Sequence, residues 1–218
     1  MFSALSCSTS LISSSIEENS YSSELEQEIT HEFKNNFKAR TQKQSILILI
    51  GGFQGSGKSS LITRIKEIYD TNVISTDSIR QSLFDRGIKV SSDFSKYVSN
   101  ISDNLVKKSL KINSNIILDA NSHSRRIAEM GKLLRENNSH YSTVKIFLNA
   151  SEATLRERIK TRKPISGCYQ GTESDLEAAL SSTKIDFEDY DLIVDTDKLS
   201  QSNVFELVND FIFSYFRQ

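Results

Sequence analysis

The chain alternates short, almost wholly apolar runs with longer segments in which apolar residues recur every three or four positions. Runs that are apolar throughout are typical of strands buried on both faces of a parallel sheet. The five runs that fit this description are Ile46–Ile50, Val73–Ser75, Ile116–Asp119, Val144–Leu148 and Leu192–Val194. The pattern therefore predicts a parallel five-stranded sheet.

The segments between and after these runs carry helical spacing. One has apolar residues at Leu61, Ile62 and Ile65, and the closing segment repeats the spacing from Val204 to Tyr215. Strands that alternate with helices along the chain favour an α/β fold, in which helices flank the sheet on both faces. We therefore expect residues 45–218 to form one α/β domain.

The first 44 residues differ from the rest. Ten of the first 23 are serine, and the opening stretch has no basic residue, so neither a secretory signal nor a mitochondrial presequence is indicated. Residues 1–23 are interpreted as a flexible, Ser-rich tail. Residues 24–44 carry Leu25, Ile29, Phe33 and Phe37, each four positions apart, which predicts an amphipathic helical extension. That helix either packs against the main domain or contacts a partner.

Composition and charge exclude several classes of protein. No apolar run is long enough to cross a bilayer, so no membrane role is expected. From residue 45 onward the chain holds 23 basic and 22 acidic residues, and this near-neutral balance does not favour an extended nucleic-acid contact. The two cysteines, Cys7 and Cys168, form no disulfide framework or zinc spacing, which fits a reducing, cytoplasmic location.

Four of the eight glycines fall within GGFQGSGKSSL, and Gly52–Ser59 satisfies G-x-x-x-x-G-K-[ST]. In this pattern glycines let backbone N–H groups surround a polyphosphate, and the following helix directs its N-terminus at the same oxygens. The pattern predicts that Lys58 reaches the β- and γ-phosphates of ATP, while the Ser59 hydroxyl holds Mg²⁺. The nucleotide-binding candidates are Gly52, Gly55, Ser56, Gly57, Lys58, Ser59 and Ser60.

Two aspartates follow predicted strands. Asp77 comes just after the second strand, with Arg80 one helical turn later, and Asp119 ends the third strand. Ligands of parallel α/β sheets bind beyond the carboxyl ends of the strands. Asp77 is therefore a candidate general base for a hydroxyl nucleophile, although it could equally cap the following helix. Asp119 is a candidate magnesium-side carboxylate.

A basic helix is predicted after the fourth strand. Arg158 and Arg162 are four residues apart, so they are expected on one helix face, from which they could offset charge on a γ-phosphate. A solvated basic helix is the alternative interpretation. The Lys163–Gln170 stretch is expected to be a mobile loop that could close over the site.

In order along the chain, GGFQGSGKSSL, STDSIRQSL, NIILDAN-x-x-x-RR and ASEATLRERIKTR resemble the small P-loop kinases of the AAA-domain group, with polynucleotide-kinase-like proteins as the nearest comparison. The resemblance covers about residues 45–218. It implies an adenylate-kinase-like sheet with ATP, Mg²⁺ and a hydroxyl acceptor. Lys58 and Ser59 match the family's phosphate loop, Asp77 its general base, Arg80 its acceptor-side arginine and Arg158 its lid arginine, with Arg162 as a second lid candidate.

These features favour an ATP-dependent kinase that phosphorylates a hydroxyl of a small-molecule or nucleotide-like acceptor. The first alternative is a polynucleotide 5′-hydroxyl kinase, which is less favoured because no basic run interleaved with aromatic residues marks the acceptor region. The second alternative is a nucleotide-dependent ATPase or binding switch without a phosphoryl acceptor, in which nucleotide orders the N-terminal helix for a partner.

Overall fold

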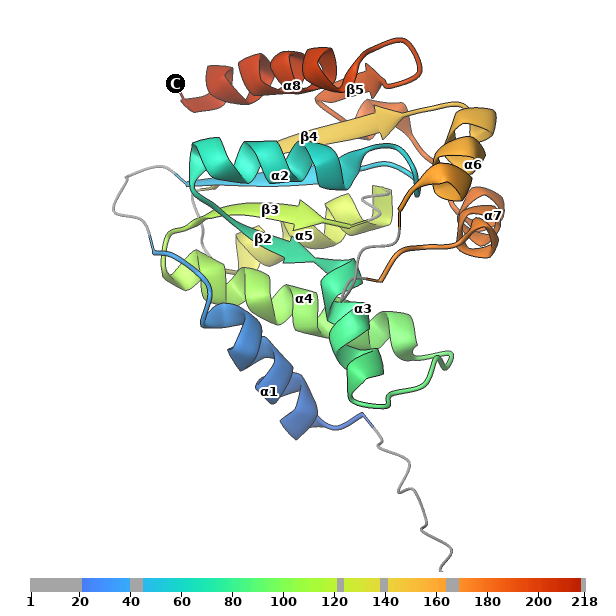
Figure 1. Cartoon of the computed structure of the whole chain (residues 1–218). Coiled ribbons are helices and arrows are strands. Elements are labelled where there is room, and N and C mark those ends of the chain that lie inside the picture. Colours follow the sequence, from blue (N-terminus) through green and yellow to red (C-terminus); the bar gives the residue numbers. More distant parts are fainter. Residues whose placement is uncertain (1–20, 40–44, 121–123, 138–140, 164–168, 217–218) are drawn as a thin grey trace, which may run out of the picture.

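A computed structural model describes residues 21–39, 45–120, 124–137, 141–163 and 169–216. Its centre is a sheet of five parallel strands in the order β2-β3-β1-β4-β5, with helices on both faces (Figure 1). The strands are β1 (Ser45–Gly51), β2 (Thr71–Ser75), β3 (Asn115–Asp119), β4 (Tyr141–Asn149) and β5 (Leu192–Asp195). The predicted α/β fold with its parallel five-stranded sheet is confirmed.

The register of the strands brings three chain segments to one point. β1 is the central strand, and Ile50 near its carboxyl end pairs with Asp119 of β3, which in turn pairs with Ser75 of β2. From β1 the chain passes to β2 on one side, and from β3 it crosses to β4 on the other side. This reversal of strand order is where α/β sheets bind their ligands.

One face of the sheet is covered by α2 (Lys58–Tyr69) and α8 (Gln201–Phe216) (Figure 1). The strands direct alternate aliphatic side chains at this face, because successive side chains of a strand point to opposite sides. The residues that form this part of the core include Ile46, Ile48, Ile50, Ile65, Val144, Ile146, Val208 and Ile212. α2 therefore packs against the sheet along most of its length, starting close to the loop that joins it to β1.

The opposite face is covered mainly by α4 (Phe94–Lys111) and α5 (Ser124–Glu136), with α3 (Thr76–Asp85) beside α4. The Arg126 guanidinium of α5 is buried, lies 2.7 Å from Asp103 of α4 and donates to the Ser102 hydroxyl at 2.9 Å. A buried charge of this kind requires its partners, so this group joins the two helices.

The N-terminal helix α1 (Ser23–Lys34) packs on this second face, where Ile29 is fully buried (Figure 1). Leu25, Phe33 and Phe37 pack against the same core, and the ring of Tyr21 stacks on Tyr97 of α4 at 3.7 Å between centroids. The helix is shorter than the predicted extension, because Asn35 and Asn36 follow it and asparagine favours turns over helix interiors. The Ser-rich tail, apart from residues 21–23, and residues 40–44 lie outside the described residues.

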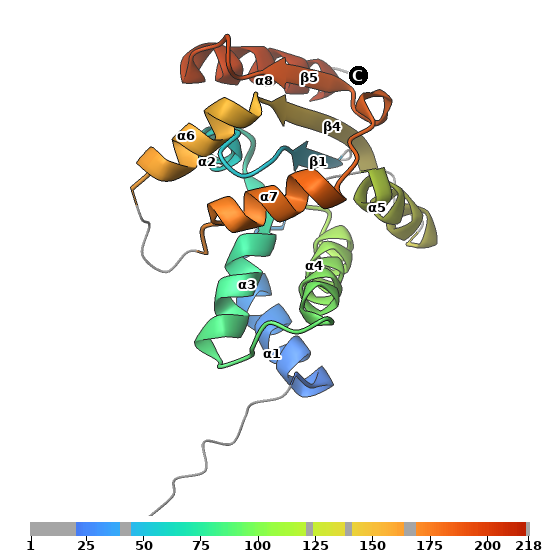
Figure 2. The same ribbon diagram turned by 90° about the vertical axis from the view of Figure 1, so that its right-hand side faces the viewer.

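The last elements gather at the carboxyl end of the sheet. α6 (Glu152–Thr161) follows β4, and α7 (Glu173–Ser182) leads through a short 3-10 turn, Phe187–Asp189, into β5. Figure 2, which looks onto this end of the strands, shows α6 and α7 in front of the sheet and α3 below them. In the described part of the chain, no helix is both long and apolar enough to span a membrane.

Candidate functional site

The loop between β1 and α2 has a conformation that only glycine adopts readily at three positions. Gly52, Gly55 and Gly57 have φ values of 142°, 85° and 99°. A Cβ atom at Gly52 would lie 2.5 Å from the Ser56 Oγ and 2.7 Å from the Leu148 carbonyl oxygen. At Gly55 a Cβ would lie 2.8 Å from the Leu155 carbonyl oxygen. The loop is thus a tight backbone turn enclosed by β4 and α6.

The loop presents polar groups suited to a polyphosphate. α2 begins at Lys58, and its N-cap Gly57 offers no side-chain hydrogen bond to the first turn. The Ser56 Oγ is buried and has no hydrogen-bond partner among the described residues. Uncapped helix N-termini and inward backbone N–H groups bind anions. The residues present therefore fit the phosphates of ATP, and the exposed Ser59 and Ser60 follow in the first turn of α2.

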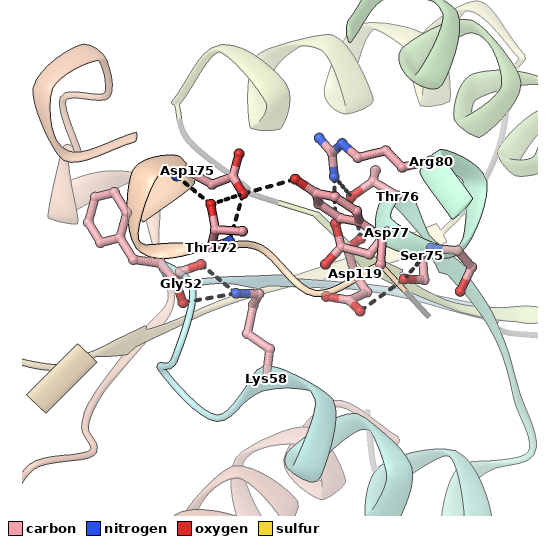
Figure 3. A network of polar contacts seen from close by, with 12 residues as sticks. Gly52, Lys58, Ser75, Thr76, Asp77, Arg80, Asp119, Thr172 and Asp175 are labelled. Atoms are coloured by element: carbon pink, nitrogen blue, oxygen red, sulfur yellow. Dashed lines mark hydrogen bonds and ion pairs between the residues drawn. The ribbon is translucent and has the colours of Figure 1, made fainter. Parts of the chain in front are cut away.

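The Lys58 ammonium lies over the loop that precedes it. Its Nζ donates to the carbonyl oxygens of Gly52 at 2.6 Å and Phe53 at 3.1 Å. Burial lowers the pKa of Lys58, while the charges of Asp119 and Asp77 act in the opposite direction. Lys58 is thus within electrostatic reach of both aspartates, and Figure 3 shows the three side chains around one space.

Asp119 ends β3 next to the phosphate loop. Its Oδ2 accepts a hydrogen bond from the Ser75 hydroxyl at 3.2 Å, and its main-chain oxygen accepts one from Thr76. Burial raises the pKa of Asp119, Lys58 opposes that shift, and Asp77 adds to it. A divalent cation would offset the cost of burying this carboxylate.

The Ser59 hydroxyl and Asp119 are the protein groups that fit magnesium. The described residues contain no group of three or more His, Cys, Asp or Glu side chains arranged for a metal ion. Mg²⁺ commonly takes only one or two protein oxygens and completes its shell with phosphate and water. The residues present therefore fit a cation that arrives with a nucleotide.

Asp77 does not cap α3. The N-cap is Ser75, whose hydroxyl accepts from the Ser78 amide at 3.5 Å, and Asp77 lies within the first turn. The Asp77 Oδ1 accepts from Arg80 Nη1 at 2.6 Å, and the same nitrogen reaches the Thr76 hydroxyl at 3.3 Å. Asp77 is thus available to the space beside Lys58 and Asp119, oriented by Arg80 from its own helix (Figure 3).

Arg158 lies in α6 against the underside of the phosphate loop. Its guanidinium donates to the Gly55 carbonyl oxygen at 3.3 Å and to the hydroxyl and carbonyl oxygens of Thr196 at 3.0 and 2.8 Å. The structure therefore places Arg158 as a link between the loop and the end of β5. Its lid role stays a prediction.

The expectation that Arg158 and Arg162 share a helix face is wrong. α6 ends at Thr161, and Arg162 has extended backbone with φ −67° and ψ 145°. Arg162 donates to the carbonyl oxygen of Gly171, so it joins the two ends of the segment between α6 and α7. Most of the predicted mobile loop, residues 164–168, lies outside the described residues.

Sequence reasoning missed the residues that the α6–α7 segment brings to Arg80. Tyr169 donates from its hydroxyl to Asp175 Oδ2 at 2.9 Å, and its ring lies 5.6 Å from that of Phe84 on α3. Burial and Asp175 raise the pKa of Tyr169 to about 12. The charge of Arg80 lowers this pKa and the charge of Asp77 raises it, both by less than burial and Asp175 do. Only the T-x-x-D capping pattern at Thr172 marked this region, and it predicts a helix start rather than a site.

A family model described as an AAA domain matches residues 47–184, which is more than half of the chain. The chain belongs to this AAA-domain family. The matched range runs from β1 through α7, so it includes the phosphate loop, Asp77, Asp119 and the α6–α7 segment. The resemblance to small P-loop kinases of the AAA-domain group is confirmed.

Solved structures show the same fold. A Chloroflexus aurantiacus protein with a provisional kinase assignment is 20% identical with a TM-score of 0.57, over 77% of this chain and 98% of its own. A Janibacter sugar kinase has 14% identity and a TM-score of 0.57, over 77% and 94%. A Sinorhizobium meliloti gluconokinase has 20% identity and a TM-score of 0.54, over 81% and 99%. A search of curated protein sequences gave no match.

Proposed function

We propose that this AAA-domain protein is an ATP-dependent kinase that transfers the γ-phosphoryl group to a hydroxyl of a small-molecule or nucleotide-like acceptor. The observation that carries the proposal is the convergence of Lys58, Asp119 and Asp77 at the carboxyl ends of β1, β3 and β2. One position offers a phosphate-binding ammonium, one a metal-side carboxylate and one a candidate base. The likeness in fold to structures described as sugar kinase and gluconokinase supports the same reaction class.

In this proposal, ATP binds with its phosphates along the Gly52–Ser60 loop. Lys58 exchanges its bonds to the Gly52 and Phe53 carbonyl oxygens for β- and γ-phosphate oxygens. The Ser59 hydroxyl and the Asp119 carboxylate would hold Mg²⁺, which when bound would supply positive charge to the phosphate oxygens. The loop conformation that Arg158 supports through the Gly55 carbonyl would keep the amides directed at the same oxygens.

Asp77 accepts the acceptor's hydroxyl proton while that oxygen attacks the γ-phosphorus. The bond from the γ-phosphorus to the β–γ bridging oxygen breaks, and ADP leaves with that electron pair. Arg80 holds the Asp77 carboxylate in place through the 2.6 Å bond. A direct contribution from Arg158 or Arg162 to the γ-phosphate would require each to leave its present hydrogen bonds.

The test is incubation of the full chain with γ-labelled ATP and Mg²⁺ over a panel of hydroxyl acceptors. We expect label on a small molecule, and we expect Asp77→Ala to slow transfer about 10²-fold or more while ATP affinity is unchanged. Lys58→Ala serves as the control that impairs nucleotide binding itself. Unchanged turnover in Asp77→Ala would remove Asp77 from the mechanism.

The alternatives give different products in the same assay. Label on a 5′-hydroxyl oligonucleotide would indicate the polynucleotide kinase, and label released only as inorganic phosphate would indicate the ATPase or switch. The packing of α1 bears on the switch, because Ile29 is fully buried and Arg86 of the α3 cap contacts Glu32 at 2.6 Å. Removal of α1 would expose core residues, so a loss of partner binding after deletion must be checked against unfolding.

A further inference from the structure

Two carboxylates from different elements lie within electrostatic reach of the Arg80 guanidinium, and one of them, Asp77, is paired with it at 2.6 Å. Asp77 comes from the same helix, and Asp175 comes from the first turn of α7, across the site in Figure 3. Burial acts to raise the pKa of Asp175, but hydrogen bonds from Thr172 and Tyr169 and the charge of Arg80 outweigh it and lower the pKa. The Arg80 charge therefore acts on two carboxylates at this end of the site.

Each carboxylate keeps one oxygen for a ligand. The three donors to Asp175 are the Thr172 amide at 2.6 Å, the Thr172 hydroxyl at 2.8 Å and the Tyr169 hydroxyl at 2.9 Å, and all of them reach Oδ2. Asp77 uses Oδ1 for Arg80. Among the described residues, no donor reaches Asp175 Oδ1 or Asp77 Oδ2. These two oxygens can accept hydrogen bonds but cannot donate them.

Arg80 supplies hydrogen-bond donors beside these two acceptor oxygens. Within the described structure only its Nη1 donates, to Asp77 and to Thr76. A hydroxyl group both donates and accepts, so it can satisfy a carboxylate oxygen and a guanidinium nitrogen together. A carboxylate or phosphate can only accept, and it would add a third negative charge beside a single guanidinium. Like charges at such distances oppose binding.

Aromatic side chains lie on the same side of the site. Tyr169 and Phe84 are both partly buried, with their rings 5.6 Å apart, and Phe84 stacks on Phe94 at 5.0 Å. Small-molecule sites typically combine apolar and aromatic surface with a few directed polar groups. An uncharged carbon chain or ring with several hydroxyls suits this combination.

We infer that Tyr169 and Asp175 complete the acceptor site, and that this site selects a neutral polyhydroxylated acceptor, such as a sugar or polyol, over an anionic one. The inference rests on the proposed kinase function and names the acceptor class for it. Asp77 and Asp175 would each accept a hydrogen bond from an acceptor hydroxyl, and Tyr169 would position Asp175.

The experiment compares matched acceptors in the labelled-ATP assay with the full chain. The pairs are glycerol and glycerate, ribose and ribonate, and glucose and gluconate, with a 5′-hydroxyl oligonucleotide alongside, and ATP binding is measured separately. We expect the neutral member of the best pair to have at least about tenfold higher kcat/KM. In Asp175→Asn, this neutral-to-acid ratio should fall about tenfold, because one negative charge is removed.

Asp175→Asn keeps an oxygen for the Thr172 amide, so the start of α7 is preserved. Glu173→Gln is the matched control: it removes the same charge from the same helical turn, but Glu173 faces Lys160 at 3.5 Å instead of Arg80. Its acceptor ratio should equal that of the unmodified chain. Tyr169→Phe should raise KM for the neutral acceptor severalfold with little change in kcat, because the hydrogen bond to Asp175 is lost.

Higher kcat/KM for the acids would overturn the inference and leave the kinase proposal intact. Higher kcat/KM for the oligonucleotide would overturn the inference and indicate the polynucleotide kinase instead. A neutral preference that Asp175→Asn leaves unchanged would overturn the role of Asp175. If ATP binds but no acceptor is labelled, the kinase proposal fails, and the acceptor inference fails with it.

Discussion

The phosphate loop and the acceptor side of the site are built in opposite ways. The phosphate loop is one continuous segment, residues 52–60, and its shape depends on glycines whose φ angles are positive. The acceptor side combines Asp77 and Arg80 of α3 with Tyr169 and Asp175, which lie about a hundred positions later. A local backbone conformation supports the first, and packing between distant elements supports the second.

This difference indicates which substitutions the phosphate loop and the acceptor side would each tolerate least. The phosphate loop tolerates no added atom at Gly52, because β4 and Ser56 surround it. The proposed acceptor side depends instead on how α7 and α3 approach each other, so its residues come together only through tertiary packing.

The largest expected effect separates close packing from backbone strain in the phosphate loop. Gly52→Ala places a Cβ 2.5 Å from the Ser56 Oγ. We expect overpacking to lower the free energy of unfolding by about 1–3 kcal/mol, in addition to the cost of backbone strain. ATP affinity should fall at least about tenfold. Gly87→Ala is the control, because Gly87 has φ 77° but no atom within 4 Å of the added Cβ. It should lose only about 1–2 kcal/mol, with ATP affinity unchanged.

Denaturant unfolding and calorimetric ATP titration measure both effects. Equal losses in the two variants would mean that strain alone governs the loop, and the contrast between the enclosed loop and the acceptor side would disappear.

An intermediate effect tests how the loop is supported from below. Arg158→Ala removes hydrogen bonds to Gly55 and Thr196, so the free energy of unfolding should fall by about 2 kcal/mol and ATP should bind more weakly. Arg156→Ala, on the same helix, breaks a partly exposed pair with Glu152 and should leave stability almost unchanged. If Arg158→Ala leaves stability and ATP affinity intact but slows transfer, the lid role is favoured instead.

The smallest effect concerns Asp119, which lies where the two halves meet. Its pKa is raised in the folded chain, chiefly by burial, above the ordinary value of 3.8. The folded chain then binds the proton more tightly than the unfolded chain, so this stabilising contribution is present at low pH and is lost as the pH rises through the raised pKa. Relative to Asp119→Asn, the unmodified chain should become less stable as the pH increases above 3.8.

Denaturant unfolding of both chains across the acid to neutral range checks this. Addition of Mg²⁺ and ATP should reduce the difference at neutral pH, because a bound cation favours the ionised carboxylate. A difference that does not change with pH would show that Asp119 is ordinarily solvated, and its place as a metal-side group would be lost.

Much of the fold could be predicted because its signals are local. Each largely apolar run marked a strand, since a strand in the interior of the sheet, such as β1, is buried on both faces. The boundaries were less accurate at the N-terminus, where the four-residue spacing continues to Phe37 but the helix ends at Lys34. Phe37 still packs against the core from beyond the turn at Asn35 and Asn36, so a regular spacing of core contacts did not require a regular helix.

The sequence by itself determined that a glycine-rich loop lies between β1 and α2, because eight contiguous residues contain both the backbone freedom and the polar groups of the G-x-x-x-x-G-K-[ST] pattern. Only the tertiary structure decided that Ser75 rather than Asp77 caps α3, that Arg158 and Arg162 diverge, and that Asp175 lies within electrostatic reach of Arg80. The contacts of Arg158, Arg162 and Asp175 depend on where separate elements lie on the sheet. That placement comes from the sum of many buried contacts, and no single stretch of sequence encodes it.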